Sequence, residues 1–348
     1  DGGMEAVMKK RMLGTIEVGA IGMGCMGFSH AHGDPAPREE CIKMMRTAHE
    51  LGVTLYDTAD AYGNGHNEIL VGEALKPIRA EVVILTKFNP EKDPLNDPDA
   101  SLADQIEKRL DASLRRLDTD VVDIYMCHRI PEGVPIEETA EAMSSFIKKG
   151  KIRSWAMSRA DADQIERGNA IAPVSVIQNE FSMMERSPLT DGTLEACAKH
   201  GIGFTPYMPL ASGFLSGQFK PGMTYKNDDI HRTSTWFTDE NLKRNQPVLT
   251  MIDKLASEKN ATYSQIALAY LMHKYDRLVP IPGMYEMRFV KENIRAAEIE
   301  LTAEDMQFID STLDSLTIYG DCKEDKVYAL GDMLKEEGYV IGKSWENK

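Results

Sequence analysis

Cysteines and basic residues are scarce in this chain of 348 residues. The five cysteines are dispersed and form no C-x-x-C pair, which argues against a disulfide framework and for a reducing compartment. There are 40 basic and 55 acidic residues, so the formal net charge is -15. Phosphates would repel such a chain, and we therefore expect neither nucleic acid nor an anionic membrane as a partner.

Long apolar runs are also missing. No stretch approaches the ~20 apolar residues of a membrane span, and Asp1–Arg11 lacks the apolar core of a signal peptide. Asp1, Gly2 and Gly3 before Met4 are typical of residues left by cloning, so residues 1–10 are expected to be such a remnant or a flexible end. Together with the dispersed cysteines, these features predict a cytoplasmic protein.

Short apolar runs alternate with longer amphipathic segments along the chain. The runs, each a predicted strand, are Val18–Met23, Thr54–Asp57, Val82–Thr86, Val121–Met126, Ile152–Met157, Val174–Gln178, Gly203–Tyr207 and Leu278–Ile281. The predicted helices are Glu39–Leu51, Glu68–Leu75, Leu102–Leu117, Ile136–Lys149, Ala160–Asn169, Thr190–His200, Ser264–Tyr275 and Met287–Ala297. Eight strands that are each followed by a helix predict an α/β fold, a closed parallel (β/α)8 TIM barrel. A doubly wound open sheet is the alternative.

Two segments exceed a minimal barrel. Ala211–Gln246 follows the seventh predicted strand and leads to an extra helix near Val248–Lys259. A tail begins at Leu301, is expected to be helical to about Leu316, and continues as a charged C-terminal extension over 319–348. Because no Pro/Gly/Ser-rich linker interrupts the chain, we expect one domain over 1–348.

Four residues with acid–base chemistry follow successive predicted strands, where a TIM barrel has its active site. They are Asp57, Tyr62, Lys87 and His128. An ammonium such as Lys87 lowers the pKa of a neighbouring phenol, and a carboxylate keeps that ammonium charged. His128 can orient a carbonyl oxygen while Tyr62 donates a proton to it. The set predicts carbonyl reduction, or alcohol oxidation in reverse, with a small-molecule carbonyl or alcohol as the partner.

The motifs around these residues resemble the aldo-keto reductases. The matching stretches are Leu55–Gly63 with Asn67-Glu68, Leu85–Phe88, Asp123–Arg129, Gly150–Arg153, Pro206–Leu210 and Ile281–Gly283. Gly24–Gly27, Gly-Cys-Met-Gly, is most similar to a bacterial branch of the family. The resemblance implies a TIM barrel that reduces aldehydes or ketones with NADPH and without metal or flavin. It also implies that Asp57, Tyr62, Lys87 and His128 form the catalytic tetrad, with Tyr62 as the acid.

The resemblance also implies a dinucleotide site, although several positions depart from the family pattern. Ser158 and Gln178 match residues that hold the nicotinamide carboxamide, while Arg159 stands where Asn is usual. Tyr207 matches an aromatic residue that stacks on the nicotinamide. The backbone from Leu210 to Gly213 should approach the pyrophosphate, although Ala211 replaces a usual Gly.

The largest departure follows Gly283. Met284 lacks the usual hydroxyl, and Glu286 and Phe289 stand at positions that are commonly basic or contact phosphate. A carboxylate repels a 2′-phosphate but accepts hydrogen bonds from a ribose diol. NADP(H), favoured by the family, and NAD(H), favoured by these residues, are therefore expected about equally. The remaining basic residues are Arg288 and Lys291, and the adenine side is matched by Glu292 and Asn293.

The substrate pocket is expected to draw on residues after the first strand and in the long loop after the seventh. These are Cys25, Met26, Phe28, His30 and Trp236. Aromatic walls suit sugars, polycyclic ketones and aryl aldehydes alike. The oligomeric state and the physiological substrate stay open.

Three alternatives remain at this stage. Gly22–Gly27 matches the G-x-G-x-x-G pattern of a Rossmann dinucleotide site, but a loop with two prolines follows it where a helix is required. His30 and His32 could form part of a metal site, although later strand ends supply no further His or Asp. Finally, the same fold could serve as a nucleotide-binding redox sensor with little turnover.

Overall fold

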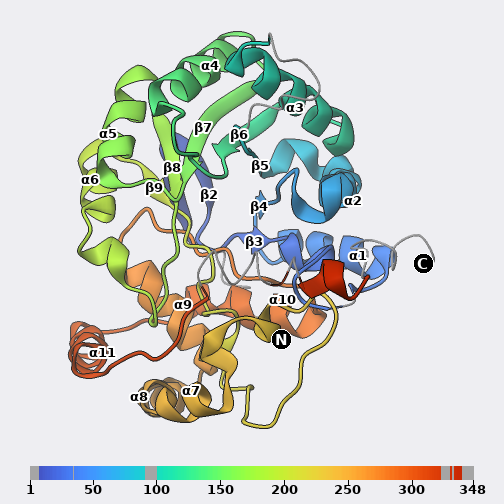
Figure 1. The fold of residues 1–348 in the computed structure, drawn as a ribbon. Coiled ribbons are helices and arrows are strands. Elements are labelled where there is room, and N and C mark those ends of the chain that lie inside the picture. Colours follow the sequence, from blue (N-terminus) through green and yellow to red (C-terminus); the bar gives the residue numbers. More distant parts are fainter. Residues whose placement is uncertain (1–7, 34, 91–99, 323–329, 331–332, 339–348) are drawn as a thin grey trace, which may run out of the picture.

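The computed structural model describes residues 8–33, 35–90, 100–322, 330 and 333–338. Seven parallel strands at its centre form one sheet in sequence order (Figure 1). They are β3 (Met23–Gly24), β4 (Leu55–Asp57), β5 (Val83–Phe88), β6 (Val122–Cys127), β7 (Ile152–Ser158), β8 (Val174–Gln178) and β9 (Gly203–Phe204). Consecutive strand order differs from that of a doubly wound sheet, so that alternative is wrong.

The predicted eighth strand, Leu278–Ile281, closes the barrel without forming a regular ladder. On one side, the Val279 amide donates to the carbonyl of Phe204 in β9 at 2.8 Å. On the other side, the Gly24 amide of β3 donates to the Pro282 carbonyl at 3.0 Å. Pro280 in this segment and Pro282 directly after it have no N–H to donate, which explains the isolated bridges. The predicted (β/α)8 barrel is confirmed.

Helices surround the strands in Figure 1. They are α1 (Arg38–Glu50), α2 (His66–Leu75), α3 (Leu102–Leu117), α4 (Ile136–Lys148), α5 (Ala162–Ile171), α6 (Thr193–His200), α9 (Tyr263–Lys274) and α10 (Met287–Ile294). Two features of the sequence favour α3. Ser101 and Asp104 form a capping box at its start, and its apolar stripe, which includes Leu110, is buried.

The segments predicted beyond a minimal barrel are helical. α7 (Asp239–Arg244) and α8 (Gln246–Lys259) follow β9, and α11 (Ala303–Ser315) lies in the tail. In Figure 1 these three helices lie together on one side of the molecule. Much of the expected C-terminal extension, and residues 1–7, fall outside the described residues.

An antiparallel hairpin, which the sequence pattern did not predict, precedes the barrel. It consists of β1 (Lys10–Leu13) and β2 (Ile16–Gly19). Lys10, expected in a flexible end, begins β1 instead. The first predicted strand, Val18–Met23, is wrong over its first half, because Val18 belongs to β2.

The hairpin plugs the N-terminal end of the barrel. Leu13, Ile16 and Val18 pack in one cluster with the inward side chains Leu55, Val83, Leu85, Ile124, Met126, Ala156, Val176, Val279 and Ile281. The Arg11 guanidinium donates to the carbonyls of Tyr275 and Leu278 at 2.8 and 3.0 Å. The plug leaves the opposite end, where the C-terminal strand ends lie, for chemistry.

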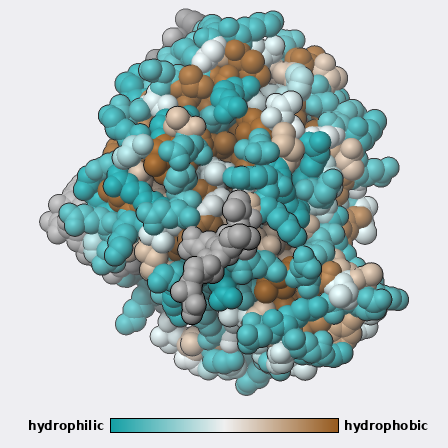
Figure 2. Space-filling model, turned by 180° about the vertical axis from the view of Figure 1, so that it is seen from behind, coloured by the Kyte–Doolittle hydropathy of each residue, from teal (hydrophilic) through white to brown (hydrophobic). Residues whose placement is uncertain are grey.

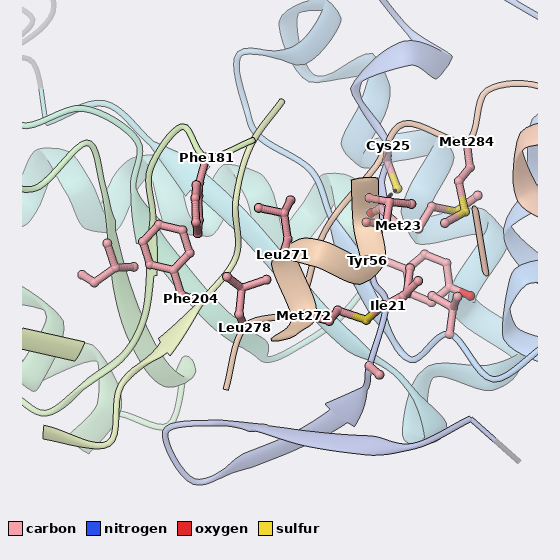
Figure 3. Packing of buried hydrophobic residues seen from close by; sticks show 14 of the residues in the cluster. Ile21, Met23, Cys25, Tyr56, Phe181, Phe204, Leu271, Met272, Leu278 and Met284 are labelled. Carbon is pink, nitrogen blue, oxygen red and sulfur yellow. Dashed lines mark hydrogen bonds between the residues drawn. The ribbon is translucent and has the colours of Figure 1, made fainter. Parts of the chain in front are cut away.

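A second and larger cluster lies between the strands and the helices. Figure 3 shows part of it, with Phe181 and Phe204 in edge-to-face contact at 6.1 Å between ring centroids. The face in Figure 2 is mainly hydrophilic, with hydrophobic residues in scattered patches, as is normal for a folded protein. Among the described residues, none of the helices is both long and apolar enough to cross a bilayer.

Candidate active site

The four predicted acid–base residues lie together at the C-terminal strand ends. Asp57 ends β4, Lys87 lies in β5, His128 follows β6, and Tyr62 begins the 3-10 helix η2 (Tyr62–Gly65). Lys87 Nζ lies 2.5 Å from Asp57 Oδ1 and 3.2 Å from the Tyr62 hydroxyl oxygen. The ring centroids of His128 and Tyr62 are 6.0 Å apart, edge to face.

The Lys87 side chain is fully buried and all its donors have acceptors. Its third hydrogen bond, at 2.8 Å, goes to the Thr58 carbonyl. Burial alone lowers the pKa of Lys87, but the Asp57 carboxylate beside it more than compensates, so this pKa lies above its ordinary value. Lys87 therefore carries its charge at neutral pH.

The pKa of Tyr62 differs from the expectation. Burial raises it, the Lys87 ammonium opposes this rise, and the pKa stays above its ordinary value. The ammonium alone would lower the pKa, as expected from the sequence. Desolvation outweighs it here, so the phenol holds its proton at neutral pH.

His128 is held in its neutral form. Burial lowers its pKa well below the ordinary value, and the charge of Lys87 lowers it further. Its backbone amide donates to the Phe88 carbonyl at 2.8 Å. Nδ1 is buried and has no hydrogen-bond partner among the described residues, which leaves this nitrogen for a ligand.

A tight turn and a buried amide position Tyr62. Gly63 and Asn64 adopt φ values of 58° and 52°, which lets the chain reverse into α2. Asn67 accepts a hydrogen bond from Thr58 Oγ1 at 2.6 Å and donates to the Cys25 carbonyl at 2.8 Å. These bonds join the ends of β3 and β4 beneath the turn.

Asn67 belongs to the Asn67-Glu68 motif, but the sequence did not predict its role in positioning Tyr62. The neighbouring Glu68 is also fully buried, and its carboxylate accepts hydrogen bonds from Thr86 Oγ1 and Arg116 Nε, both at 2.6 Å. The available signal was this pair of neighbouring polar residues just before the apolar residues of α2, because polar groups that become buried need partners.

The residues predicted for the nicotinamide lie next to the tetrad. Gln178 Nε2 donates to Asp57 Oδ2 at 2.8 Å, and Ser158 Oγ donates to the Gln178 carbonyl at 2.8 Å. Arg159 adopts a φ of 58°, and its guanidinium carbon lies 5.3 Å from the Tyr207 ring centroid. The Arg159 side chain thus contacts Tyr207 at the position where the family usually has Asn.

The turn from Leu210 to Gly213 has an unusual backbone. Ala211, Ser212 and Gly213 adopt φ values of 50°, 52° and 92°, and the Gly213 amide donates to the Leu210 carbonyl at 3.0 Å. Ala211 thus occupies the left-handed region that glycine prefers. Ala211 and Ser212 are not glycine, so surrounding contacts must hold them in this conformation.

Charge at the start of α10 is paired within the chain. Arg288 Nε lies 2.7 Å from Glu286 Oε2, and its NH2 nitrogen lies 3.3 Å from Glu286 Oε1. Both side chains are exposed. Met284 is fully buried, and Figure 3 shows it on the Cys25 side of the core cluster. Its side chain therefore packs inward, and only its backbone can face a ligand.

The residues predicted for the adenine side of a dinucleotide lie on α10. Glu292 is half-buried, and its carbonyl accepts a hydrogen bond from Gln265 Nε2 at 2.9 Å. Asn293 is buried and donates to the Gly283 carbonyl at 3.4 Å, while its Oδ1 has no partner among the described residues.

Several residues predicted for the substrate pocket lie in the core. Cys25, Phe28 and Trp236 are exposed by 0%, 1% and 2%, so they present little surface to a substrate. Met26 and His30 are half-buried. The His30 ring lies 5.9 Å from the Tyr62 ring between centroids, so the side chain of His30 lies next to the tetrad.

The glycines and histidines behind two of the alternatives have packing roles in the fold. A β-carbon on Gly24 would lie 2.7 Å from the Ile281 carbonyl oxygen, so this glycine lets β3 approach the last strand. A short 3-10 turn follows the glycines and α1 begins only at Arg38, so the Rossmann hypothesis is wrong. His32 stacks on Tyr285 at 4.3 Å. Within the described ranges, no group of three or more His, Cys, Asp and Glu is arranged to hold a metal.

Comparison with known proteins assigns the chain to a family. The aldo/keto reductase family model matches residues 20–314. The chain is 35% identical over 323 residues to the aldo-keto reductase yakc of Schizosaccharomyces pombe, whose name specifies NADP(+), and the match covers 89% of this chain and 93% of that protein.

Two solved structures extend the comparison. A thermostable aldo-keto reductase in complex with the inhibitor epalrestat has a TM-score of 0.71 at 30% identity, covering 88% of this chain and 100% of that one. An aldo/keto reductase of Klebsiella pneumoniae in complex with NADP and acetate has a TM-score of 0.69 at 25% identity, covering 88% and 95%. The chain belongs to the aldo/keto reductase family and is an oxidoreductase, which confirms the resemblance drawn from the motifs. Membership of the Gly24–Gly27 branch stays a prediction.

Proposed function

We propose that the protein reduces an aldehyde or ketone to an alcohol with a nicotinamide dinucleotide, and that it also catalyses the reverse oxidation. The observation that carries the proposal is the buried Lys87 ammonium, bound to both Asp57 and Tyr62 at the open end of the barrel. This arrangement suits a reaction in which a proton joins a carbonyl oxygen.

Tyr62 is the proton donor of this proposal. Its raised pKa keeps the phenol protonated at neutral pH, which is the form that an acid requires. As the proton leaves, the Lys87 ammonium stabilises the phenolate, and Asp57 keeps that ammonium charged. Neutral His128, through a ring N–H, orients the carbonyl oxygen toward Tyr62.

The residues present fit a bound dinucleotide, which would supply hydride to the carbonyl carbon. The buried amide oxygens of Asn179 and Asn293 lack hydrogen-bond donors among the described residues, and a nucleotide has donors to offer. Residues proposed to hold it are Ser158, Arg159, Gln178, Tyr207, Leu210, Gly213, Gly283, Met284, Arg288, Glu292 and Asn293, with Met284 contributing its backbone.

Two dinucleotides remain candidates. The yakc name and the Klebsiella complex favour NADPH. The Glu286–Arg288 pair favours NADH, because the carboxylate that neutralises Arg288 would repel a 2′-phosphate.

A binding and turnover experiment tests the proposal. The protein is titrated with NADPH and with NADH while its fluorescence quenching is followed, and a panel of aldehydes, ketones and sugars is then added. Binding followed by carbonyl-dependent oxidation of the nucleotide supports the proposal. Binding without turnover across the panel would favour a redox sensor, and binding of neither nucleotide would refute both functions.

A further inference from the structure

A short segment after β9 is tied to the loop after β3. We call residues 228–232 the strap. Asp228 Oδ2 accepts from the Ala31 amide at 2.8 Å, and the Ala31 carbonyl accepts from the Ile230 amide at 3.0 Å. The Gly33 amide donates to the Asp228 carbonyl at 3.0 Å. The strap thus joins two loops whose sequence positions are about 200 residues apart.

His231 joins the strap to the turn Leu210–Gly213. Its Nδ1 lies 2.5 Å from Asp229 Oδ1, and its Nε2 lies 2.7 Å from the Ser212 carbonyl oxygen. The Ser212 carbonyl oxygen is always an acceptor. The Asp229 carboxylate, when ionised, has no proton and is also only an acceptor. A neutral imidazole has a single N–H, so it can satisfy only one of them, whereas an imidazolium satisfies both.

Three aromatic rings surround His231. The rings of Phe219, Tyr225 and Phe237 lie 4.6, 5.1 and 4.3 Å from its ring between centroids. Aromatic faces attract a cation through their quadrupoles. The His231 ring is nearly buried, with 6% of its side chain exposed, so water does not replace the two hydrogen bonds.

The neighbouring titratable groups are consistent with an imidazolium. Burial alone raises the pKa of Asp229, but its hydrogen bond to His231 lowers that pKa below the ordinary value, so the carboxylate is ionised. Burial, with the charge of His231 next, lowers the pKa of His32 to about 4, so that ring is neutral. The other groups facing this cluster are Asp228, Arg232, His30, Tyr225, Tyr285, Asp239 and Cys322.

We propose that protonated His231 is a clasp that fastens the strap to the Ser212 turn, and that loss of its proton releases the turn. The proposal rests on the proposed function, because that turn is proposed to lie against the dinucleotide pyrophosphate. His231 is a positioning residue and touches no reacting atom. Loss of the proton leaves one nitrogen facing an acceptor, and the positive-φ backbone of Ala211, Ser212 and Gly213 then loses an external support. The dinucleotide should therefore leave slowly at low pH and faster as the pH rises through the range in which histidine changes charge.

The first test reads the imidazole directly. Nitrogen-detected NMR of the ligand-free protein, with the His231 signals assigned by their loss in His231→Gln, should find both ring nitrogens protonated at about pH 5. A single protonated nitrogen at that pH would overturn the clasp. This readout does not depend on nucleotide binding, so it separates failure of the clasp from failure of the proposed function.

The second test measures the rate of dinucleotide release by stopped-flow displacement at about pH 5 and at about pH 8. Histidine changes its charge between these two values. Loss of a charge-assisted hydrogen bond should quicken wild-type release about tenfold between these pH values. His231→Gln should release quickly at both, and Asp229→Asn, which keeps the acceptor but removes the charge, should move the transition to lower pH. The matched control is His200→Gln, because His200 pairs with Glu166 on the remote helices α5 and α6. Wild-type pH dependence in His231→Gln would refute the proposal.

Discussion

At the residue scale, the acid–base chemistry depends on the Lys87 ammonium, which donates to Asp57, Tyr62 and the Thr58 carbonyl. Each partner has a separate effect in the proposed reaction: the carboxylate holds the charge, the carbonyl fixes the position, and the phenol is the proposed proton donor. Substitution at each position should therefore give a distinct kinetic result.

Tyr62→Phe removes the proposed proton donor and keeps the ring. We expect kcat to fall by about a hundredfold to ten-thousandfold, the usual contribution of general acid catalysis. The dinucleotide Kd should change by less than about twofold, because the ring still packs against its neighbours. Steady-state kinetics and fluorescence titration measure the two quantities. Equal loss of binding and turnover would contradict the role of proton donor.

Asp57→Asn removes the carboxylate that raises the pKa of Lys87. That pKa should fall, so Lys87 should lose its proton at lower pH and the alkaline limb of the kcat–pH profile should move to lower pH. Breaking a buried pair also costs about 3–5 kcal/mol of unfolding free energy. In Asp57→Asn with Lys87→Met no unpaired charge remains, so denaturant unfolding should find this double variant more stable than Asp57→Asn. An unmoved alkaline limb would exclude Lys87 as the group that titrates.

At the element scale, two segments decide separate properties. The start of α10 carries the paired charges Glu286 and Arg288, and the β1–β2 hairpin fills the far end of the barrel. One lies in the proposed cofactor site and the other is remote from it, so their variants should affect binding and stability independently.

Glu286→Arg should shift the preference toward NADPH. The substitution frees Arg288 and adds a second cation, and a charge-assisted bond to the 2′-phosphate is worth about tenfold or more in affinity. The ratio of the NADPH and NADH dissociation constants is the measurement. Glu298→Arg, at an exposed Glu that pairs with Arg295, is the control for net charge. An equal shift in both variants would mean that Glu286 lies away from the ribose.

Leu13→Ala should destabilise the fold without affecting catalysis. Leu13 is fully buried in the hairpin plug, and loss of such a side chain costs about 2–5 kcal/mol of unfolding free energy. Because the plug lies opposite the tetrad, kcat at a temperature below the unfolding transition should stay within about twofold of wild type. Glu17→Ala, on the exposed face of β2, controls for the hairpin backbone. A large drop in kcat would mean that the two ends of the barrel are coupled.

At the scale of the whole molecule, one buried carboxyl affects how stability depends on pH. Burial, with the charge of Glu68 next, raises the pKa of Asp60 to about 6. An unfolded Asp titrates near 3.9, so the folded state binds the proton more tightly. The free energy of unfolding should therefore fall as the pH rises from about 4 to about 6.

Asp60→Asn should remove this part of the pH dependence. The expected difference between wild type and variant grows by about 2 kcal/mol over that interval. Denaturant unfolding at a series of pH values measures it, with the exposed Asp120→Asn as the control. A wild-type slope retained in Asp60→Asn would assign the pH dependence to another group.

The spacing of apolar residues predicted a strand that overlaps each of the seven sheet strands, and it predicted every barrel helix. This works because the spacing of apolar residues follows which side of an element is buried. Periodicity did not predict the hairpin Lys10–Gly19, because its two strands are short. Its apolar residues are buried only by contact with the barrel interior, which lies far away in the sequence. Periodicity also predicted a regular last strand, where two prolines allow only isolated bridges. The residues of the candidate site were likewise predictable in part. The tetrad was predictable from strand ends, whereas the burial of Cys25 and Trp236 was not.

The sequence by itself determined the order of strands and helices, the four acid–base residues and the family, because these depend on local spacing and on motifs. Only the tertiary structure decided that desolvation outweighs Lys87 in the pKa of Tyr62 and that Met284 turns inward. It likewise decided that His231 meets two acceptors. The physical reason is that burial and hydrogen-bond partners arise between segments far apart in the chain, and a linear pattern does not specify those distances.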